Sequence, residues 1–203
     1  MKEIASASNP GMKIEEKKVL IFDSCQYSTL GLTLLCERHS NWHITGVAHS
    51  FPKLMKLLAL GRADMLLCGI GALQSEFPRL LNLPDYTRGR CILLIDKNSG
   101  ALRNTFLAAG YTAVIGKNAD LEVLDNLLFY NMHMPYSTMK GDDAGIYLPQ
   151  ERAVLGALLS GKRPLDIATD MGITYRDVSR HKHNGLRRAG VRSINEIIMK
   201  KRK

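Results

Sequence analysis

The sequence predicts an α/β domain built on a doubly wound, five-stranded parallel sheet, followed by a smaller all-α domain. Short apolar runs alternate with stretches of helical spacing from residue 17 to residue 131, whereas apolar residues after residue 147 recur only at helical spacing. Between them, residues 132–146 are rich in Pro, Gly, Ser, Thr and Asp, a composition typical of a linker. The predicted order is a loose tail at 1–16, an α/β domain at 17–131, a linker at 132–146 and an α domain at 147–203.

The α/β domain begins with the run KVLIFD at residues 18–23, which is apolar apart from its two ends. Such a run is typical of a strand that a parallel sheet buries on both faces. Further strands are predicted at residues 44–48, 65–68, 91–95 and 113–115. Helices are predicted at residues 30–35, 51–60, 80–83, 102–109 and 121–130. The alternation of five strands with five helices predicts the parallel sheet.

Functional groups of such sheets collect at the carboxyl ends of the strands. Those ends carry Asp23, Ser24, Gly69, Asp96 and Lys117. Together with the ungapped stretch VLIFDSCQYSTLGL and an Ala-Gly pair ahead of the last strand, this arrangement resembles the receiver domain of bacterial response regulators. The resemblance implies two acids that hold Mg²⁺, an acceptor Asp that takes a phosphoryl group, a hydroxyl residue and a Lys that neutralises charge.

The sequence keeps only two of these five groups, Asp23 and Lys117. Ser24 stands in place of the second acid, Gly69 in place of the acceptor and Asp96 in place of the hydroxyl. The degenerate site therefore predicts a domain that aspartyl phosphorylation does not switch, because glycine has no side chain to phosphorylate.

A shifted alignment of the third strand would not restore an acceptor, because no Asp or Glu occurs between Asp64 and Glu76. We expect Lys117 to pair with Asp23 or Asp96 and so to hold the domain in one state. A solvent-separated arrangement of these charges is the alternative, since such pairs are often weak.

The charge of the chain is unevenly distributed. Its 28 basic and 19 acidic residues give a net charge of +9, of which residues 146–203 carry +8 and residues 1–145 only +1. A concentrated basic segment indicates a polyanionic partner, either nucleic acid or an anionic membrane surface.

The basic segment contains the spacing of a helix-turn-helix. A first helix is predicted from Pro149 and ends before Gly161, and residues 164–183 carry the framework. Its members are a small residue at the helix crossing, a turn glycine, an N-cap and two apolar plugs: Ala168, Gly172, Thr174, Ile173 and Val178.

The second helix of the motif, predicted from Tyr175 to about Ala189, has one apolar and one basic face. A helix that enters the major groove carries residues of this kind. The candidate DNA-binding residues are Arg176, Ser179, Arg180, Lys182, His183, Asn184, Arg187 and Arg188. A merely solvated basic helix is the alternative. His181 and His183 predict no metal site, because positions i and i+2 of a helix do not share a face.

Residues 149–191 resemble the LuxR/FixJ (GerE-type) DNA-binding domain without gaps, in the ER-x-VL opening, the GK-x-x-x-DIA stretch and VSRHKHNGLRRAGV. The resemblance implies a four-helix domain that dimerises through its last helix, here residues 193–200. It implies base-edge contacts by Ser179, Arg180 and His183. Phosphate contacts are implied for Arg176, Lys182, Arg187 and Arg188. This family usually has Lys where Ser179 stands, so no target sequence is carried over.

The whole chain thus resembles an atypical response regulator, and its segment DSCQYSTLGLT is most similar to auxiliary regulators of the enterobacterial Rcs type (RcsA and BglJ). Those regulators lack the phosphorylation site and act with a second regulator, RcsB. We expect a cytoplasmic transcription regulator that binds double-stranded DNA as a homodimer or as a heterodimer with an RcsB-like receiver-type regulator. RNA polymerase is a further candidate partner. The alternative is an interaction protein that docks on a partner regulator, its basic domain giving only non-specific grip.

Other classes of function are disfavoured. The sequence has no GxGxxG, P-loop or GxSxG motif and no nucleophile–base pair, so no enzyme and no cofactor are expected. No apolar run is long enough for a membrane span, and the first residues lack the apolar core of a secretory signal. The cysteines, Cys25, Cys36, Cys68 and Cys91, are widely spaced, which predicts reduced and mostly buried thiols rather than metal ligands.

Overall fold

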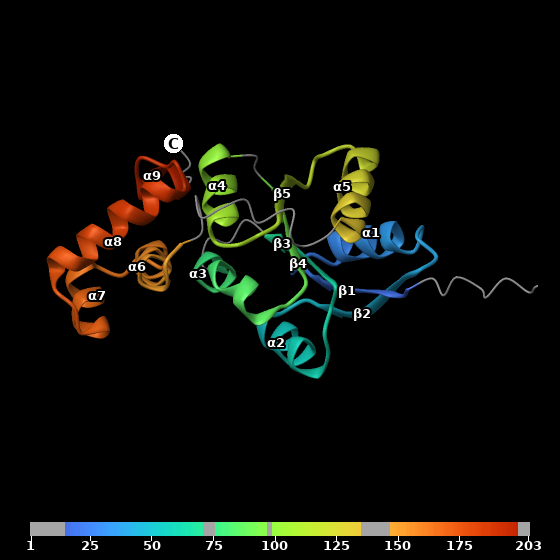
Figure 1. Cartoon of the computed structure of the whole chain (residues 1–203), viewed down its shortest axis with the longest axis horizontal. Helices are drawn as coiled ribbons and strands as arrows, with labels where there is room; N and C mark the ends of the chain where they lie inside the picture. Colours follow the sequence, from blue (N-terminus) through green and yellow to red (C-terminus); the bar gives the residue numbers. More distant parts are fainter. Residues whose placement is uncertain (1–14, 71–75, 97–98, 135–146, 199–203) are drawn as a thin grey trace, which may run out of the picture.

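The computed structural model describes residues 15–70, 76–96, 99–134 and 147–198. Its centre is a five-stranded parallel sheet in the order β2-β1-β3-β4-β5, which confirms the predicted doubly wound domain (Figure 1). The strands are β1 (Lys17–Phe22), β2 (Trp42–Ala48), β3 (Met65–Ile70), β4 (Arg90–Ile95) and β5 (Ala113–Gly116). Every residue of β3 and β4 is buried, as expected for central strands covered on both faces.

Helices cover both faces of the sheet. They are α1 (Gln26–Cys36), α2 (Phe51–Leu60), α3 (Phe77–Leu81), a short 3₁₀ helix η2 (Leu83–Tyr86), α4 (Gly100–Ala108) and α5 (Leu121–His133). Helices α1 and α5 lie on one side of the sheet, and α2, α3 and α4 on the other (Figure 1). Alternation along β1 sends Val19 and Ile21 to the first layer and Leu20 and Phe22 to the second.

Two predicted boundaries need correction. The helix predicted at residues 80–83 is instead the pair α3 and η2, each with a proline in its first turn, where the missing N–H costs no hydrogen bond. Helix α5 continues to His133, so the first two residues of the predicted linker are helical, and buried Met132 anchors that last turn in the core beneath α1 and α5. The remaining predicted linker from residue 135 and the first 14 residues of the predicted tail lie outside the described residues.

The second half is all-helical, with α6 (Pro149–Leu159), α7 (Pro164–Met171), α8 (Tyr175–Arg188) and α9 (Ile194–Ile197). Val154, Ile167, Ala168 and Val178 form a small core between α6, α7 and α8. Gly172 ends α7 with φ 63°, a left-handed conformation that glycine adopts without steric penalty. The predicted framework of the helix-turn-helix is thus present.

The two halves share one hydrophobic core, which no pattern in the sequence indicates. Side chains of α6, α8 and α9 pack with the buried residues of α3 and α4, and Figure 1 shows α6 and α9 beside those two helices. Polar contacts join the same surfaces. The backbone N–H of Tyr147 donates to the carbonyl of Ala108 at 2.8 Å, and Arg152 forms an ion pair with Asp85.

Among the helices that the structure describes, none combines the length and the apolar character that crossing a bilayer requires. Cys25 is exposed and the other three cysteines are buried, which confirms the prediction that the thiols are mostly buried. Burial raises the pKa of both Cys36 and Cys91 to about 12, so these two thiols stay protonated near neutral pH.

Candidate nucleic-acid interface

The start of α8 is fixed by a reciprocal cap. The hydroxyl of Thr174 accepts from the backbone N–H of Asp177 at 3.1 Å, and the Asp177 carboxylate accepts from the backbone N–H of Thr174 at 3.2 Å. This is the predicted capping pair, and it satisfies two donors that a helix end leaves open. Hydrogen bonding by Thr174 is the main cause that lowers the pKa of Asp177, so its carboxylate is charged at neutral pH.

One face of α8 anchors the helix to the rest of the domain. Val178, Leu186 and Ala189 are buried, as predicted. Gly185 lets α6 approach, because a Cβ placed there would lie 2.7 Å from Cδ1 of Leu155. This packing fixes the orientation of α8 about its own axis, so that the opposite face points outward.

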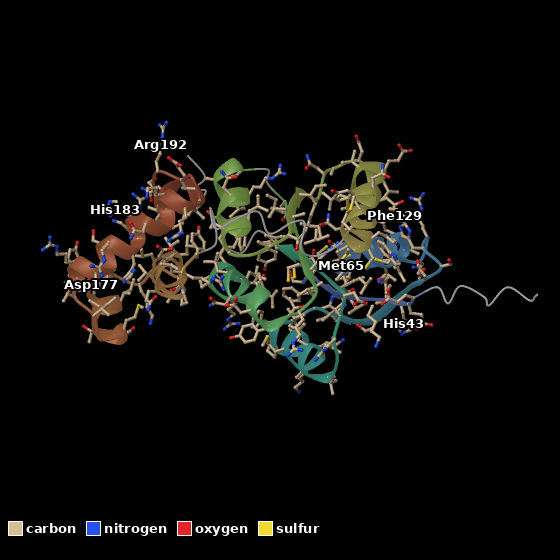
Figure 2. All side chains as sticks on the ribbon, viewed as in Figure 1. His43, Met65, Phe129, Asp177, His183 and Arg192 are labelled. Carbon is tan, nitrogen blue, oxygen red and sulfur yellow. The ribbon has the colours of Figure 1, made fainter. Side chains whose placement is uncertain are left out.

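The outward face brings together five of the predicted DNA-binding residues. They line an open hollow of about 600 Å³ along α8: Arg176, Ser179, Arg180, His183 and Asn184. In Figure 2, Asp177 lies on the part of α8 nearest α7, and His183 lies further along the same helix. Arginine, imidazole, amide and hydroxyl groups on one helix face supply both donors and acceptors for the edges of base pairs.

Two of these side chains have a defined polar contact within α8, an ion pair for Arg180 and a hydrogen bond for His183. A guanidinium nitrogen of Arg180 lies 2.8 Å from Oδ1 of Asp177. Nδ1 of His183 lies 2.7 Å from the carbonyl oxygen of Ser179, so Nδ1 carries the hydrogen and neutral His183 presents Nε2 as an acceptor. These contacts keep the guanidinium of Arg180 and the imidazole of His183 close to the surface of α8.

The remaining predicted residues are placed differently. Arg187 is exposed and its guanidinium lies 3.4 Å from Oδ1 of Asn184. Arg188 pairs at 2.8 Å with Glu151, whose side chain is only 1% exposed. The structure thus gives Arg188 a partner inside the domain, and its predicted phosphate contact stays a prediction.

Lys182 lies on a neighbouring surface with Arg192, a residue that is not among those predicted from the sequence. Both line a hollow of about 260 Å³ between α8 and the start of α9, together with Ser193 and Asn195. Figure 2 shows Arg192 at the α9 end of the domain. The sequence places Arg192 in the basic segment, which is the one signal that could have marked it as a binding residue. It was not predicted because it lies beyond the helix-turn-helix pattern.

The carboxyl edge of the sheet holds a separate ionic cluster. Nζ of Lys117 lies 2.7 Å from Asp23 and 3.2 Å from Asp96, so it pairs with both carboxylates, where the sequence predicted pairing with one or the other. Asp23 is fully buried and also accepts from the backbone N–H of Cys25 at 2.9 Å. Burial by itself lowers the pKa of Lys117, but the hydrogen bonds and charges of Asp23 and then Asp96 outweigh it, so the pKa is raised.

Gly69, Ser24 and Asp64 complete the picture of the strand ends. Gly69 is the fifth residue of β3 and pairs with Leu94 of β4, and Ser24 is exposed directly after Asp23. Asp64 lies at the opposite end of β3, where it accepts from the backbone N–H of Lys18 at 2.7 Å. Within the described ranges, no group of three or more His, Cys, Asp or Glu side chains is arranged to hold a metal ion.

Comparison with known proteins adds a family and a fold. Residues 149–200 match the family GerE, bacterial regulatory proteins of the luxR family. The fold is similar to that of RcsB from Salmonella enterica serovar Typhimurium bound to the promoter rprA, with a TM-score of 0.56, 16% identity, and coverage of 92% of this chain and 100% of that chain. RcsB bound to the promoter P1flhDC gives a TM-score of 0.50 at 16% identity, covering 91% of this chain and 97% of that one.

The first half has its own structural relative. The signal receiver domain of the response regulator NarL from Mycobacterium tuberculosis gives a TM-score of 0.50 at 13% identity, covering 60% of this chain and 99% of that chain. No curated protein matches this sequence. The solved structures, all below 25% identity, show the fold alone: a receiver-like domain joined to a helix-turn-helix domain.

Proposed function

Residues 149–200 match the luxR family of bacterial regulatory proteins, and on this premise we propose that the chain is a transcription regulator that binds double-stranded DNA through α8. The observation that carries the proposal is the hollow lined by Arg176, Ser179, Arg180, His183 and Asn184. Its side chains come from the face of α8 opposite the buried one, on the helix that a helix-turn-helix inserts into the major groove. Such a regulator works on the chromosome, in the bacterial cytoplasm.

Phosphorylation independence is the second part of the proposal. Gly69 offers no acceptor oxygen, and the ammonium of Lys117 already has two carboxylate partners. The ionic cluster supports a receiver-like domain that stays in one state, with activity set by the amount of the chain or by a partner.

Pairing with a second chain is the third part. We propose that the regulator acts on DNA as a homodimer or as a heterodimer with another receiver-type regulator. Ile197 of α9 is only 1% exposed and packs in the core shared with α4, so pairing through α9 requires that helix to leave α4. Size exclusion of the chain with and without a co-expressed receiver-type regulator, followed by DNA binding of each species, separates the two assemblies.

The central experiment begins with selection of duplexes from a randomised DNA pool by the full-length chain, which defines an operator. Binding to that operator is then compared for wild type, Arg180→Ala and Arg187→Ala. Arg180→Ala should relax base preference at one position, by the roughly 1–3 kcal/mol of a bidentate guanine contact. Arg187→Ala should weaken all duplexes alike and lower the slope of log affinity against log salt by about 1.

Arg38→Ala is the matched control, because Arg38 is exposed just after α1, on the side of the sheet away from the C-terminal helices. It should leave operator binding unchanged. Enrichment of no sequence, with binding that depends only on salt, would contradict specific regulation and favour the interaction protein with a non-specific grip on DNA.

A further inference from the structure

The carboxylate of Asp177 makes two kinds of contact, one with each oxygen. Oδ2 accepts from the backbone N–H of Thr174 at 3.2 Å and from its hydroxyl at 2.6 Å. Oδ1 lies 2.8 Å from NH2 of Arg180, one turn further along α8. The same side chain therefore ties the start of the helix to an arginine of the outward face.

The second contact restricts a side chain that would otherwise move freely. Arg180 is 64% exposed, and a long exposed arginine loses rotamer freedom when it binds. A partner that already holds the guanidinium near the bound geometry reduces this loss. The backbone N–H of Thr174 donates to Oδ2 of Asp177 at 3.2 Å whatever the side chain at position 174, so the carboxylate is a fixed reference point for Arg180.

The chemistry of guanidinium leaves enough donors for a base. Arginine has five N–H groups in a planar fork, and its contact with Asp177 at 2.8 Å is made through NH2. The remaining N–H groups can reach the two acceptors that guanine presents in the major groove. Because the guanidinium is planar and rigid, the contact of its NH2 group with Asp177 also sets the direction in which its other N–H groups point.

The charge of Asp177 has the opposite effect on affinity. It is the acidic residue of the first turn of α8, on a helix whose other charged groups are basic. A carboxylate near the DNA backbone repels phosphates whatever the sequence, so it weakens non-specific binding. A residue that lowers sequence-independent affinity for DNA and also directs an arginine to a base raises the selectivity for the operator.

We propose that Asp177 is a positioning residue that directs Arg180 to one base pair and lowers sequence-independent binding. This inference rests on the proposed function, because it assigns the contact by which α8 selects its DNA. The chain offers an internal comparison at the start of α7, where Asp166 pairs with Arg163 at 3.3 Å with the same spacing but away from the face of α8.

The test uses the full-length chain, the duplex selected by wild type and a scrambled duplex of equal length. Asp177→Asn should lower the ratio of operator to scrambled affinity about 3- to 10-fold, a fraction of the discrimination that one arginine–guanine contact gives. Affinity for the scrambled duplex should rise at the same time. In a chain that carries Arg180→Ala, adding Asp177→Asn should change the ratio no further, since the positioned group is gone.

Two controls separate positioning from folding. Thr174→Ala removes the hydroxyl of the cap but keeps the carboxylate, so it should lower the melting temperature while the ratio stays near wild type. Asp166→Asn should leave the ratio unchanged. Asp177→Glu, which keeps the charge on a longer side chain, should recover part of the ratio.

The inference is overturned if Asp177→Asn leaves the ratio unchanged, if its effect persists in the Arg180→Ala chain, or if Thr174→Ala lowers the ratio equally. These results differ from failure of the proposed function, in which the wild-type chain itself selects no sequence from the pool.

Discussion

A Cβ atom placed on Gly69 would lie 1.8 Å from Oδ2 of Asp23 and 2.4 Å from its Cγ. The carboxylate of Asp23 therefore occupies the space beside the end of β3 into which a side chain at position 69 would extend. It is held there by Lys117 at 2.7 Å. The glycine at position 69 and the buried ion pair depend on each other, because a Cβ at this position would overlap the Asp23 carboxylate where it now lies.

Gly69→Ala should destabilise the chain by about 3 kcal/mol, because the new methyl group overpacks a fully buried carboxylate. The measurement is the free energy of unfolding in urea. Gly31→Ala is the control: Gly31 lies in α1, where a Cβ would have no atom within 4 Å, and the substitution should add about 0.5–1 kcal/mol through helix propensity. Equal stability of the Gly69→Ala chain and wild type would show that Asp23 moves aside freely.

Lys117→Met should cost about 3–5 kcal/mol, because it leaves the buried carboxylate of Asp23 without its counter-ion. Asp23→Asn in the same chain should recover most of this loss, since the buried charge is then removed. A Lys117→Met chain as stable as wild type would mean that the ion pair contributes nothing to folding.

The same ion pair predicts a dependence on alkaline pH. Because the pKa of Lys117 is raised in the folded chain, its contribution is complete below the ordinary lysine value of about 10.4 and is lost as pH rises through the raised pKa. The difference in unfolding free energy between wild type and Lys117→Met should be constant from about pH 7 to about pH 9 and then shrink. A difference that grows at more alkaline pH would contradict this sign.

Gly172→Ala should destabilise the helix-turn-helix by about 1 kcal/mol, because φ 63° is unfavourable for a residue with a Cβ. No atom lies within 4 Å of a Cβ at this position, so the effect is conformational rather than steric. Gly172→Asn should therefore cost less, since asparagine tolerates the left-handed region better. Thermal unfolding followed by circular dichroism compares the two, and the reverse order would count against this account of the turn.

The shared core predicts that both halves unfold together. Ile197→Ala should lower stability by about 2–5 kcal/mol, and Trp42, the single tryptophan, should report the loss by fluorescence although it lies in the other half. Leu165→Ala is the control, because Leu165 is exposed on α7 and its truncation should have little effect. Two separate transitions, with that of Trp42 unchanged by Ile197→Ala, would contradict a common core.

Much of the fold was predictable because its signals are local. The apolar run before Asp23 predicts a buried strand from residue order alone, and the Thr174–Asp177 cap follows from spacing. The pairing of Lys117 followed from topology, since parallel strands bring their carboxyl ends to one edge. Each of these inferences needs only neighbours along the chain or the order of strands.

The remaining features depend on contacts distant in sequence. Burial of Ile197 against the α4 side of the core has no local signal, because an apolar residue on a short helix looks the same whichever surface covers it. The pairing of Arg188 was also hidden, because its partner Glu151 lies far earlier in the chain, on α6. Charge pattern alone does not show which cations the fold itself uses.

The contact between Asp23 and position 69 also bears on how this site can change over generations. An aspartate introduced at position 69 alone would clash with the carboxylate of Asp23. This single substitution is therefore expected to make the chain less stable than wild type. The side chain of Asp23 therefore has to shift before position 69 can carry an acceptor side chain.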